Sequence, residues 1–152
     1  MMNQKIEQYK NAFLKATNRS LETEVEIFSF GDTAEMADEL GKLVLQGKKT
    51  GTSSGYDLYA KDETKPYKGQ LSIVLDSEDS PICVIENINV ETIPFNKVTK
   101  EHARKEGEGD LSLEYWKKAH LDFFPRYYKE ELDIEFSENH RIIYEEFKVV
   151  FI

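Results

Sequence analysis

Two apolar segments joined by an acidic turn lie near the middle of the chain, 69-GQLSIVLDSEDSPICVIENINV-90. In the first segment apolar side chains recur at every second residue, Leu71, Ile73 and Leu75, which is typical of a β-strand. Residues 76–81 carry the Asp, Ser and Pro of a turn, and residues 82–90 are rich in the β-branched residues that strands favour. The stretch therefore predicts a β-hairpin.

Helices and further strands are interleaved around this hairpin. Residues 24–30 begin with alternating acidic and apolar side chains and predict a strand, and residues 142–152 predict another because they are dense in β-branched and aromatic residues. Hairpin-like turns, rather than regular crossovers, join consecutive strands, so we expect an α+β domain built around a small curved sheet or barrel. The apolar spacing predicts helices over residues 3–17, 32–47, 96–105 and 112–125.

The helix predicted over residues 32–47 has recognisable end signals. Asp32 and Glu35 have the spacing of a capping box, in which each side chain satisfies a free backbone amide of the other residue. Gly47 is a favourable C-terminal stop. The stripe expected to face the core is formed by Ala37, Leu40 and Val44.

The composition indicates one folded domain of 152 residues, which is enough chain to bury a substantial core. Hydrophobic residues make up 39% and aromatic residues 12% of the chain, which is too much for an intrinsically disordered protein. The 29 acidic residues outnumber the 20 Lys and Arg residues and give a formal net charge of -9. Because phosphate binding needs clustered cations, we expect neither duplex DNA nor an anionic membrane as a partner.

The cysteine content predicts a reducing compartment, and the hydropathy bears on secretion and membrane insertion. Cys83 is the single cysteine, so it cannot form an intramolecular disulfide or a Cys-based zinc site, and we expect it to be a small buried hydrophobe on a strand. No apolar stretch of the sequence has the length of a signal peptide or a membrane span. We therefore expect a cytoplasmic protein.

The first segment that could carry chemistry follows the second predicted helix, 47-GKKTGTSS-54. If this segment enters a strand, Thr50, Thr52 and Ser54 share one face, while Lys49 and Ser53 lie on the other. A lysine desolvated in a pocket loses its proton more readily and can then activate a neighbouring hydroxyl. The alternative is a pair of solvated lysines at a helix C-terminus, followed by a Ser/Thr-rich loop.

The second such segment is the acidic turn 106-EGEGD-110. Mutual repulsion or burial of Glu106, Glu108 and Asp110 would raise one pKa, which keeps a general acid protonated at neutral pH. The same oxygens could hold Mg²⁺, or the segment could be a solvated turn between two helices. His102 lies four residues before Glu106 and would share its helix face.

The remaining histidines and the large aromatic residues favour a structural interpretation. His102, His120 and His140 lie far apart and lack the spacing of a zinc site. His120 falls on the apolar face of the predicted helix 112–125, so we expect a hydrogen-bonded core residue. Trp116 on the same face is expected to belong to the core.

Several of these motifs together resemble the ASCH domain family, which is similar to RNA-binding PUA domains. The resemblance implies a PUA-like small β-barrel with flanking helices. It also divides the chain into an N-terminal helical extension, residues 1–23, and an ASCH-like domain, residues 24–152. The motifs that carry it are Phe28-Ser29-Phe30-Gly31-Asp32, Ala37-Asp38-Glu39-Leu40, Gly47-Lys48-Lys49-Thr50, His102-Ala103, Glu106-Gly107-Glu108-Gly109-Asp110, Trp116, His120 and Phe123-Phe124.

Some compact ASCH proteins are amidohydrolases that deacylate N4-acetylcytidine with a lysine, a threonine and a glutamate. Their motifs match this chain so that Lys49 would be the base, Thr52 the nucleophile and Glu106 the proton donor. The resemblance implies a site that needs no metal or other cofactor. Residues expected to bind the substrate, a small nucleoside-like molecule, are Lys48, Thr50, Ser53, Ser54 and Asp110.

This chain departs from the compact enzymes in two places. Ser54 stands where they carry an arginine, two residues after the catalytic threonine. The segment 107–110 is an extension that they lack, so we expect a different pocket mouth here. The lysine pair Lys48 and Lys49 on an acidic body predicts a small basic pocket for one nucleotide-sized ligand.

Two other functions remain open from the sequence. The first is a non-catalytic module that binds short single-stranded RNA through Lys48, Lys49 and the hydroxyl row. The second is a metal-dependent ribonuclease in which Glu106, Glu108 and Asp110 hold Mg²⁺ or Mn²⁺.

Overall fold

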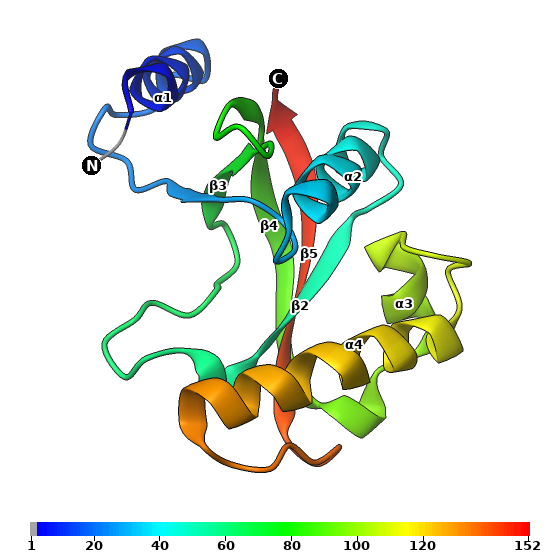
Figure 1. Ribbon diagram of the computed structural model, residues 1–152. Coiled ribbons are helices and arrows are strands. Elements are labelled where there is room, and N and C mark those ends of the chain that lie inside the picture. The colour runs from blue at the N-terminus through cyan, green and yellow to red at the C-terminus, as the bar shows by residue number, and fades with distance from the viewer. Residues whose placement is uncertain (1–2) are drawn as a thin grey trace.

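A curved five-stranded sheet is the centre of the fold, and the computed structural model describes it within residues 3–152 (Figure 1). The strand order is β1-β3-β4-β5-β2; β1 pairs with β3 in parallel and the other pairs are antiparallel. The predicted hairpin is confirmed as β3 and β4, in which Leu71 lies opposite Glu86. The strands are β1 (Glu26–Phe28), β2 (Gly51–Gly55), β3 (Leu71–Leu75), β4 (Pro81–Pro94) and β5 (Arg141–Phe151).

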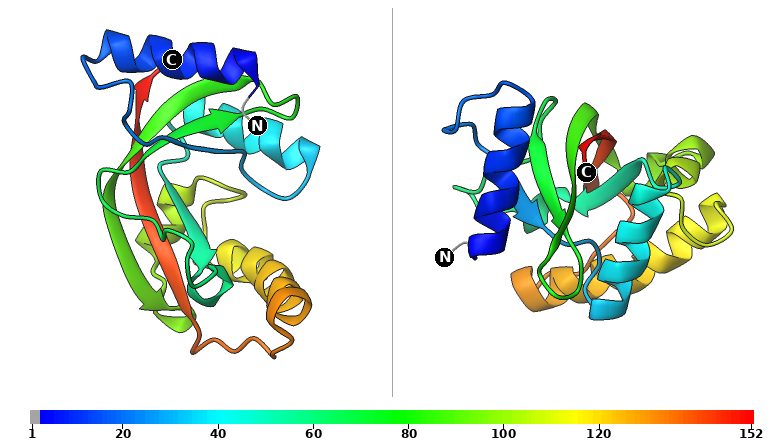
Figure 2. Two further views of the ribbon diagram at one scale, coloured as in Figure 1. Left: turned by 90° about the vertical axis from the view of Figure 1, so that its left-hand side faces the viewer. Right: turned by 90° about the horizontal axis from the view of Figure 1, so that it is seen from above.

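The long central strands give the sheet its curvature. Register shifts interrupt the pairing of β4 with β5 at Val84/Ile85 and at Asn87/Asn89, and such irregularities bend a strand pair and increase its twist. In the left view of Figure 2, β4 and β5 form a long arc, with α2 (Ala34–Leu45) and α4 (Leu113–Tyr127) on its concave side. The protein is therefore an α+β domain with a PUA-like half-barrel sheet.

The first helix, α1 (Gln4–Ala16), lies at one end of this arc and confirms the helix predicted over residues 3–17 (Figure 2). Its Phe13 and Leu14 are fully buried and pack in one cluster with Ile73 of β3 and Val84 of β4. Each such side chain stabilises the fold by about 1.5–3 kcal/mol. The helix thus shares the core of the sheet, and the division of the chain after residue 23 stays a prediction.

The cap of α2 differs from the sequence prediction. Thr33 is the N-cap, and its hydroxyl accepts a hydrogen bond from the Met36 amide at 3.1 Å. The carboxylate of Asp32 instead accepts hydrogen bonds from Arg126 and Tyr127 near the end of α4. The capping box of Asp32 with Glu35 is therefore wrong, because the helix begins one residue later than that pairing requires.

The remaining helices pack against the end of the sheet that lies away from α1 (Figure 1). α3 (Lys100–Glu106) and α4 enclose an aromatic cluster that includes Phe95, Trp116, Phe124 and Tyr144. α4 continues through Pro125 to Tyr127, two residues beyond the end of the helix predicted over residues 112–125. Within residues 3–152 no helix has the length and apolarity needed to span a membrane.

Candidate functional site

Lys49 is buried between the end of α2 and the start of β2. Its side chain is 1% exposed, and its Nζ donates to the Gly51 carbonyl at 2.9 Å, the Glu106 carbonyl at 3.3 Å and the Glu108 carboxylate at 2.9 Å. These acceptors match the three protons of a lysine ammonium group. The solvated lysine that remained an alternative for this position is therefore wrong.

The close approach of α3 to the Lys49 backbone depends on Gly107. This residue ends α3 with a φ of +72°, and a Cβ at this position would collide with the carbonyl oxygen of Lys48. Glycine alone adopts this geometry without strain or overlap. Gly107 thereby brings its two neighbours, Glu106 and Glu108, close to Lys49. Thr50 also holds α3 against the segment between α2 and β2, because its amide and its hydroxyl both donate to the carbonyl of Lys105.

Glu106 is a buried carboxylate whose Oε2 accepts two hydrogen bonds. It is 2% exposed, and its Oε2 accepts hydrogen bonds from the Ser53 hydroxyl at 2.9 Å and from the Trp116 indole at 2.6 Å. Its Oε1 lies 3.8 Å from Nζ of Lys49. A buried charge is tolerated only with such pairing and hydrogen bonding.

His120 lies at the same cluster, which the sequence did not indicate. Nδ1 donates to the Trp116 carbonyl at 2.7 Å, because a carbonyl can only accept, and Nε2 lies 3.2 Å from the Ser53 hydroxyl. The ring stacks on the Trp116 indole at 4.1 Å between centroids. His102 lies elsewhere: it completes the cap of α3 with Thr99 and bonds to Glu91.

A small cavity of about 120 Å³ brings the three predicted catalytic residues together. Lys49, Thr52 and Glu106 all line it, together with Ser53 and His120. Within residues 3–152 the Thr52 hydroxyl makes no side-chain hydrogen bond, whereas the hydroxyl in direct contact with Glu106 is that of Ser53. The apolar part of the wall is formed by Phe30, Met36, Leu40, Ala119 and Phe123.

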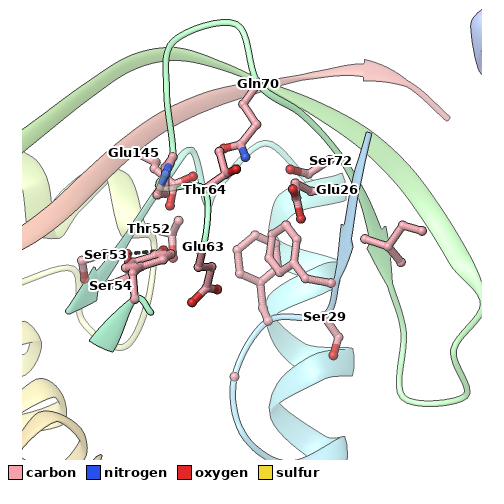
Figure 3. A pocket seen from close by; sticks show the side chains of 16 residues that line it. Glu26, Ser29, Thr52, Ser53, Ser54, Glu63, Thr64, Gln70, Ser72 and Glu145 are labelled. Atoms are coloured by element: carbon pink, nitrogen blue, oxygen red, sulfur yellow. Dashed lines mark hydrogen bonds between the residues drawn. The ribbon is translucent and has the colours of Figure 1, made fainter. Parts of the chain in front are cut away.

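A larger cavity of about 430 Å³, which we call the acidic recess, shares lining residues with the small cavity. Figure 3 shows the side chains that line the recess. Both edge strands of the half-barrel line it, and Phe30, Gly31, Thr52 and Ser53 belong to both cavities. Thr52 therefore lies at the junction of the two. The polar residues of the recess are Glu26, Ser29, Thr52, Ser53, Ser54, Tyr59, Glu63, Thr64, Gln70, Ser72 and Glu145.

The alternation of β2 assigns its hydroxyls to different neighbours. Thr52 lies opposite Glu145 of β5, and directly opposed residues of antiparallel strands share a face of the sheet. Ser54 lies on this face too, where its hydroxyl bonds to that of Tyr59 at 2.9 Å. Ser53 points the other way, toward Glu106. The predicted faces of the segment are confirmed for Thr52, Ser54 and Ser53.

The recess is acidic. Burial raises the pKa of Glu145, against the opposing effects of its hydrogen bond from Asn87 and the positive charge of Lys49. Burial also raises the pKa of Tyr59, with smaller contributions in the same direction from the charges of Glu145, Glu63 and Glu26. In the part of the chain that the structure describes, no Lys, Arg or His lines the recess.

The predicted small basic pocket is therefore wrong. Lys48 is exposed and lines neither the small cavity nor the acidic recess. Lys49 lines the small cavity, but its charge is paired with Glu108 and lies near Glu106. The segment 47–54 contains the two lysines, whereas the carboxylates that the fold brings against Lys49 come from the distant segment 106–110.

Asp110, like Lys48 and Thr50, is a predicted site residue that lines neither cavity. It is exposed, and hydrogen bonds from the side chain and then the backbone of Ser112 lower the pKa of its carboxyl group. Glu106 and Glu108 bind Ser53 and Lys49 instead. Across residues 3–152 no three His, Cys, Asp or Glu side chains are grouped to hold a metal ion. The metal-binding trio expected for a ribonuclease is therefore not formed.

Comparisons with known proteins agree with this architecture. The family model for the ASCH domain matches residues 26–151. A crystal structure of an ASCH domain from Lactobacillus crispatus JV V101 is 34% identical, with a TM-score of 0.85 and full coverage of both chains, 100% and 100%. A crystal structure of protein EF3133 from Enterococcus faecalis V583 is 32% identical, with a TM-score of 0.89, covering 99% of this chain and 90% of its own. No curated protein matches the sequence.

Proposed function

The chain belongs to the ASCH domain family, and we propose that it is a hydrolase that cleaves a small linear amide, the N-acyl group of an acylated amine such as N4-acetylcytidine. The observation that carries the proposal is the shared lining of the small cavity by Lys49, Thr52 and Glu106. A base, a free hydroxyl and a buried carboxyl group around one cavity are the components of covalent amide hydrolysis.

The charged pair supplies the protons. Lys49 and Glu106 lie 3.8 Å apart, from Nζ to Oε1, and the proposed mechanism moves one proton between them. Transfer of that proton from the ammonium to the carboxylate gives an amine and a carboxylic acid without any change in total charge. The amine keeps two N–H donors for the Gly51 carbonyl and Glu108, and its lone pair becomes the base.

In the first half of the reaction, the Thr52 hydroxyl oxygen attacks the acyl carbon and its proton passes to the Lys49 amine. The C–N bond breaks as the Glu106 carboxylic acid protonates the departing nitrogen, which leaves an ester on Thr52 and a free amine. The Thr52 side chain makes no hydrogen bond among residues 3–152 that would compete with its attack on the acyl carbon.

In the second half, water attacks the ester and gives its proton to the Glu106 carboxylate. The Thr52 oxygen leaves and recovers a proton from the Lys49 ammonium, so both groups return to their starting forms. One amide and one water become one carboxylic acid and one amine. The Ser53 hydroxyl, which joins Glu106 to His120, keeps the carboxyl group oriented throughout.

The charge of the site argues against the RNA-binding alternative. Glu26, Glu63 and Glu145 line the acidic recess, and phosphate groups would be repelled by them. A neutral acylated nucleoside meets no such repulsion. Short single-stranded RNA is therefore expected not to bind at low salt, and tight, salt-dependent RNA binding would contradict this part of the proposal.

The test is turnover of N4-acetylcytidine and a panel of acylated amines, followed by chromatographic detection of the free amine. Thr52→Ala is expected to lower turnover by about 10²-fold or more. Thr92→Ala is the matched control, because Thr92 is an exposed residue of β4 and lines neither cavity. Full activity of Thr52→Ala, or a wild-type protein inactive on the whole panel, would overturn the proposal.

A further inference from the structure

Two cavities meet at Thr52, and their linings differ in a way that separates the two halves of an amide substrate. The small cavity has an apolar wall of Phe30, Met36 and Phe123 and a volume of about 120 Å³, which corresponds to about four water molecules of liquid volume. It has room for a short acyl group. The acidic recess on the other side of Thr52 is more than three times larger.

We propose that the acidic recess is a binding site for an organic cation, so that the preferred substrate is a short diamine or polyamine acylated on one nitrogen. This substrate class rests on the proposed hydrolase, whereas binding of the cation itself does not. The acyl group would occupy the small cavity, the amide would lie at Thr52, and the distal ammonium group would lie in the recess.

Unpaired polar groups deep in the recess support a bound ligand. Ser72 and Gln70 are each 8% exposed, and both line the recess from β3 or just before it (Figure 3). Among residues 3–152 neither the Ser72 hydroxyl nor the Gln70 amide nitrogen has a side-chain hydrogen-bond partner, and Gln70 Oε1 receives only a long bond of 3.4 Å from Asn87. These two side-chain atoms are not among the solvent-inaccessible unpaired atoms of residues 3–152, so they reach the open space of the recess, where a ligand can bond to them.

The carboxylates around these groups determine the charge of that ligand. Glu26 lies beside Ser72 in the parallel pairing of β1 with β3, Glu145 of β5 is half-buried in the lining, and Glu63 comes from the loop between β2 and β3. An ammonium group carries three N–H donors and no acceptor, and the Ser72 hydroxyl and the carboxylates are acceptors. An anion would meet repulsion from three carboxylates and no compensating cation in the described lining.

The aromatic residues of the recess add to this preference. Phe28 and Phe30 pack against each other at 4.8 Å between centroids, and both line the recess. The Phe30 ring already has a cation near its face, since Nζ of Lys49 lies 5.4 Å from its centroid. Aromatic faces attract ammonium groups electrostatically, and carboxylates beside them strengthen the attraction.

The experiment measures binding by calorimetry at low salt with 1,4-diaminobutane, its neutral analogue 1,4-butanediol, and cytidine 5′-monophosphate. We expect the diamine to bind at least tenfold more tightly than the diol and the nucleotide not to bind. Glu63→Gln and Glu26→Gln, both at exposed positions, should each weaken diamine binding by threefold or more. Glu78→Gln in the turn between β3 and β4 is the matched control, because this residue does not line the recess.

Equal binding of diamine and diol, or unchanged affinity in both Glu63→Gln and Glu26→Gln, would overturn the inference. The same titration with Thr52→Ala protein separates it from the hydrolase proposal. Diamine binding together with inactivity toward mono-acetylated diaminobutane and the rest of the acylated panel would leave the cation site standing and reject the hydrolase. Turnover of N4-acetylcytidine without diamine binding would reject the cation site alone.

Discussion

The indole nitrogen of Trp116 lies 2.6 Å from Oε2 of Glu106, so the single tryptophan of the chain donates to its most deeply placed site carboxylate. This contact joins the core of α4 to the end of α3. It explains why a residue expected to serve only packing also controls the carboxyl group on which the proposed proton transfers depend. Oε2 keeps one other donor, the Ser53 hydroxyl.

Trp116→Phe removes this donor and keeps an aromatic ring. We expect the free energy of unfolding to fall by about 1–3 kcal/mol, the cost of leaving a buried acceptor short of a donor, and hydrolysis to slow by about tenfold or more. Chemical denaturation and turnover measure the two effects.

Phe124→Leu is the control in the same aromatic cluster. It loses packing without losing a donor, so it should destabilise the fold and leave the pH profile of turnover unchanged. An identical pH profile in Trp116→Phe would contradict the role given to the contact.

Lys49→Met leaves Glu108 and Glu106 without their buried cation. Breaking a buried pair by removing one partner costs about 3–5 kcal/mol, so we expect a loss of this size in the free energy of unfolding, reduced by the partial exposure of Glu108. The double variant Lys49→Met/Glu108→Gln should recover part of the stability and none of the activity. Recovery of activity along with stability would show that Lys49 is structural only.

Gly107→Ala tests the approach of α3 to the Lys48 backbone. Both Gly107 and Gly47 have a left-handed φ, of +72° and +74°, but a Cβ at Gly47 meets no atom within 4 Å. Gly47→Ala should therefore cost only the conformational penalty of about 1–2 kcal/mol. Gly107→Ala should cost more, because the added methyl group collides with the Lys48 carbonyl and displaces Lys49 as well. Equal thermal stability of the two variants would contradict this account of the junction.

Glu145→Gln tests the burial of the carboxyl group opposite Thr52. The raised pKa means that the folded state binds a proton more readily than the unfolded state, so ionisation of Glu145 destabilises the fold as pH rises above 4.5, its ordinary pKa. The amide of Gln can still accept the hydrogen bond from Asn87. We expect Glu145→Gln to be more stable than the wild type at neutral pH and equally stable well below pH 4.5, as measured by denaturation across pH. The opposite sign at neutral pH would contradict the prediction.

Local signals in the sequence located much of the fold. The β3–β4 hairpin, the stop at Gly47 and the alternation of β2 depend on neighbouring residues, and the structure confirms each. The capping box at Asp32 was wrong because Thr33, the next residue, is also a favourable cap, and the Asp32 carboxylate accepts hydrogen bonds from Arg126 and Tyr127 instead.

The site was only partly predictable for a physical reason. Lys49, Thr52 and Glu106 carry recognisable motifs, but Glu145 reaches the site through the pairing of β2 with β5, which no local pattern specifies. His120 was visible as a residue four positions after Trp116 on one helix face, yet its contact with Ser53 depends on how α4 lies across β2. Charge at a site is the sum of such long-range contacts, so counting Lys48 and Lys49 alone predicted the wrong sign for the pocket.

Acid quenching during turnover, followed by peptide mass mapping, tests the central claim most directly. In the proposed mechanism the acyl group passes through an ester on Thr52, so the peptide that carries Thr52 should gain one acyl mass in quenched wild-type protein and not in Thr52→Ala. Glu106→Gln should form the ester more slowly, because it lacks the acid that protonates the departing nitrogen, and should also hydrolyse any ester more slowly, because it lacks the base for attack by water. An acyl group mapped to Ser53, or continued turnover by Thr52→Ala with no ester at this residue, would contradict the account.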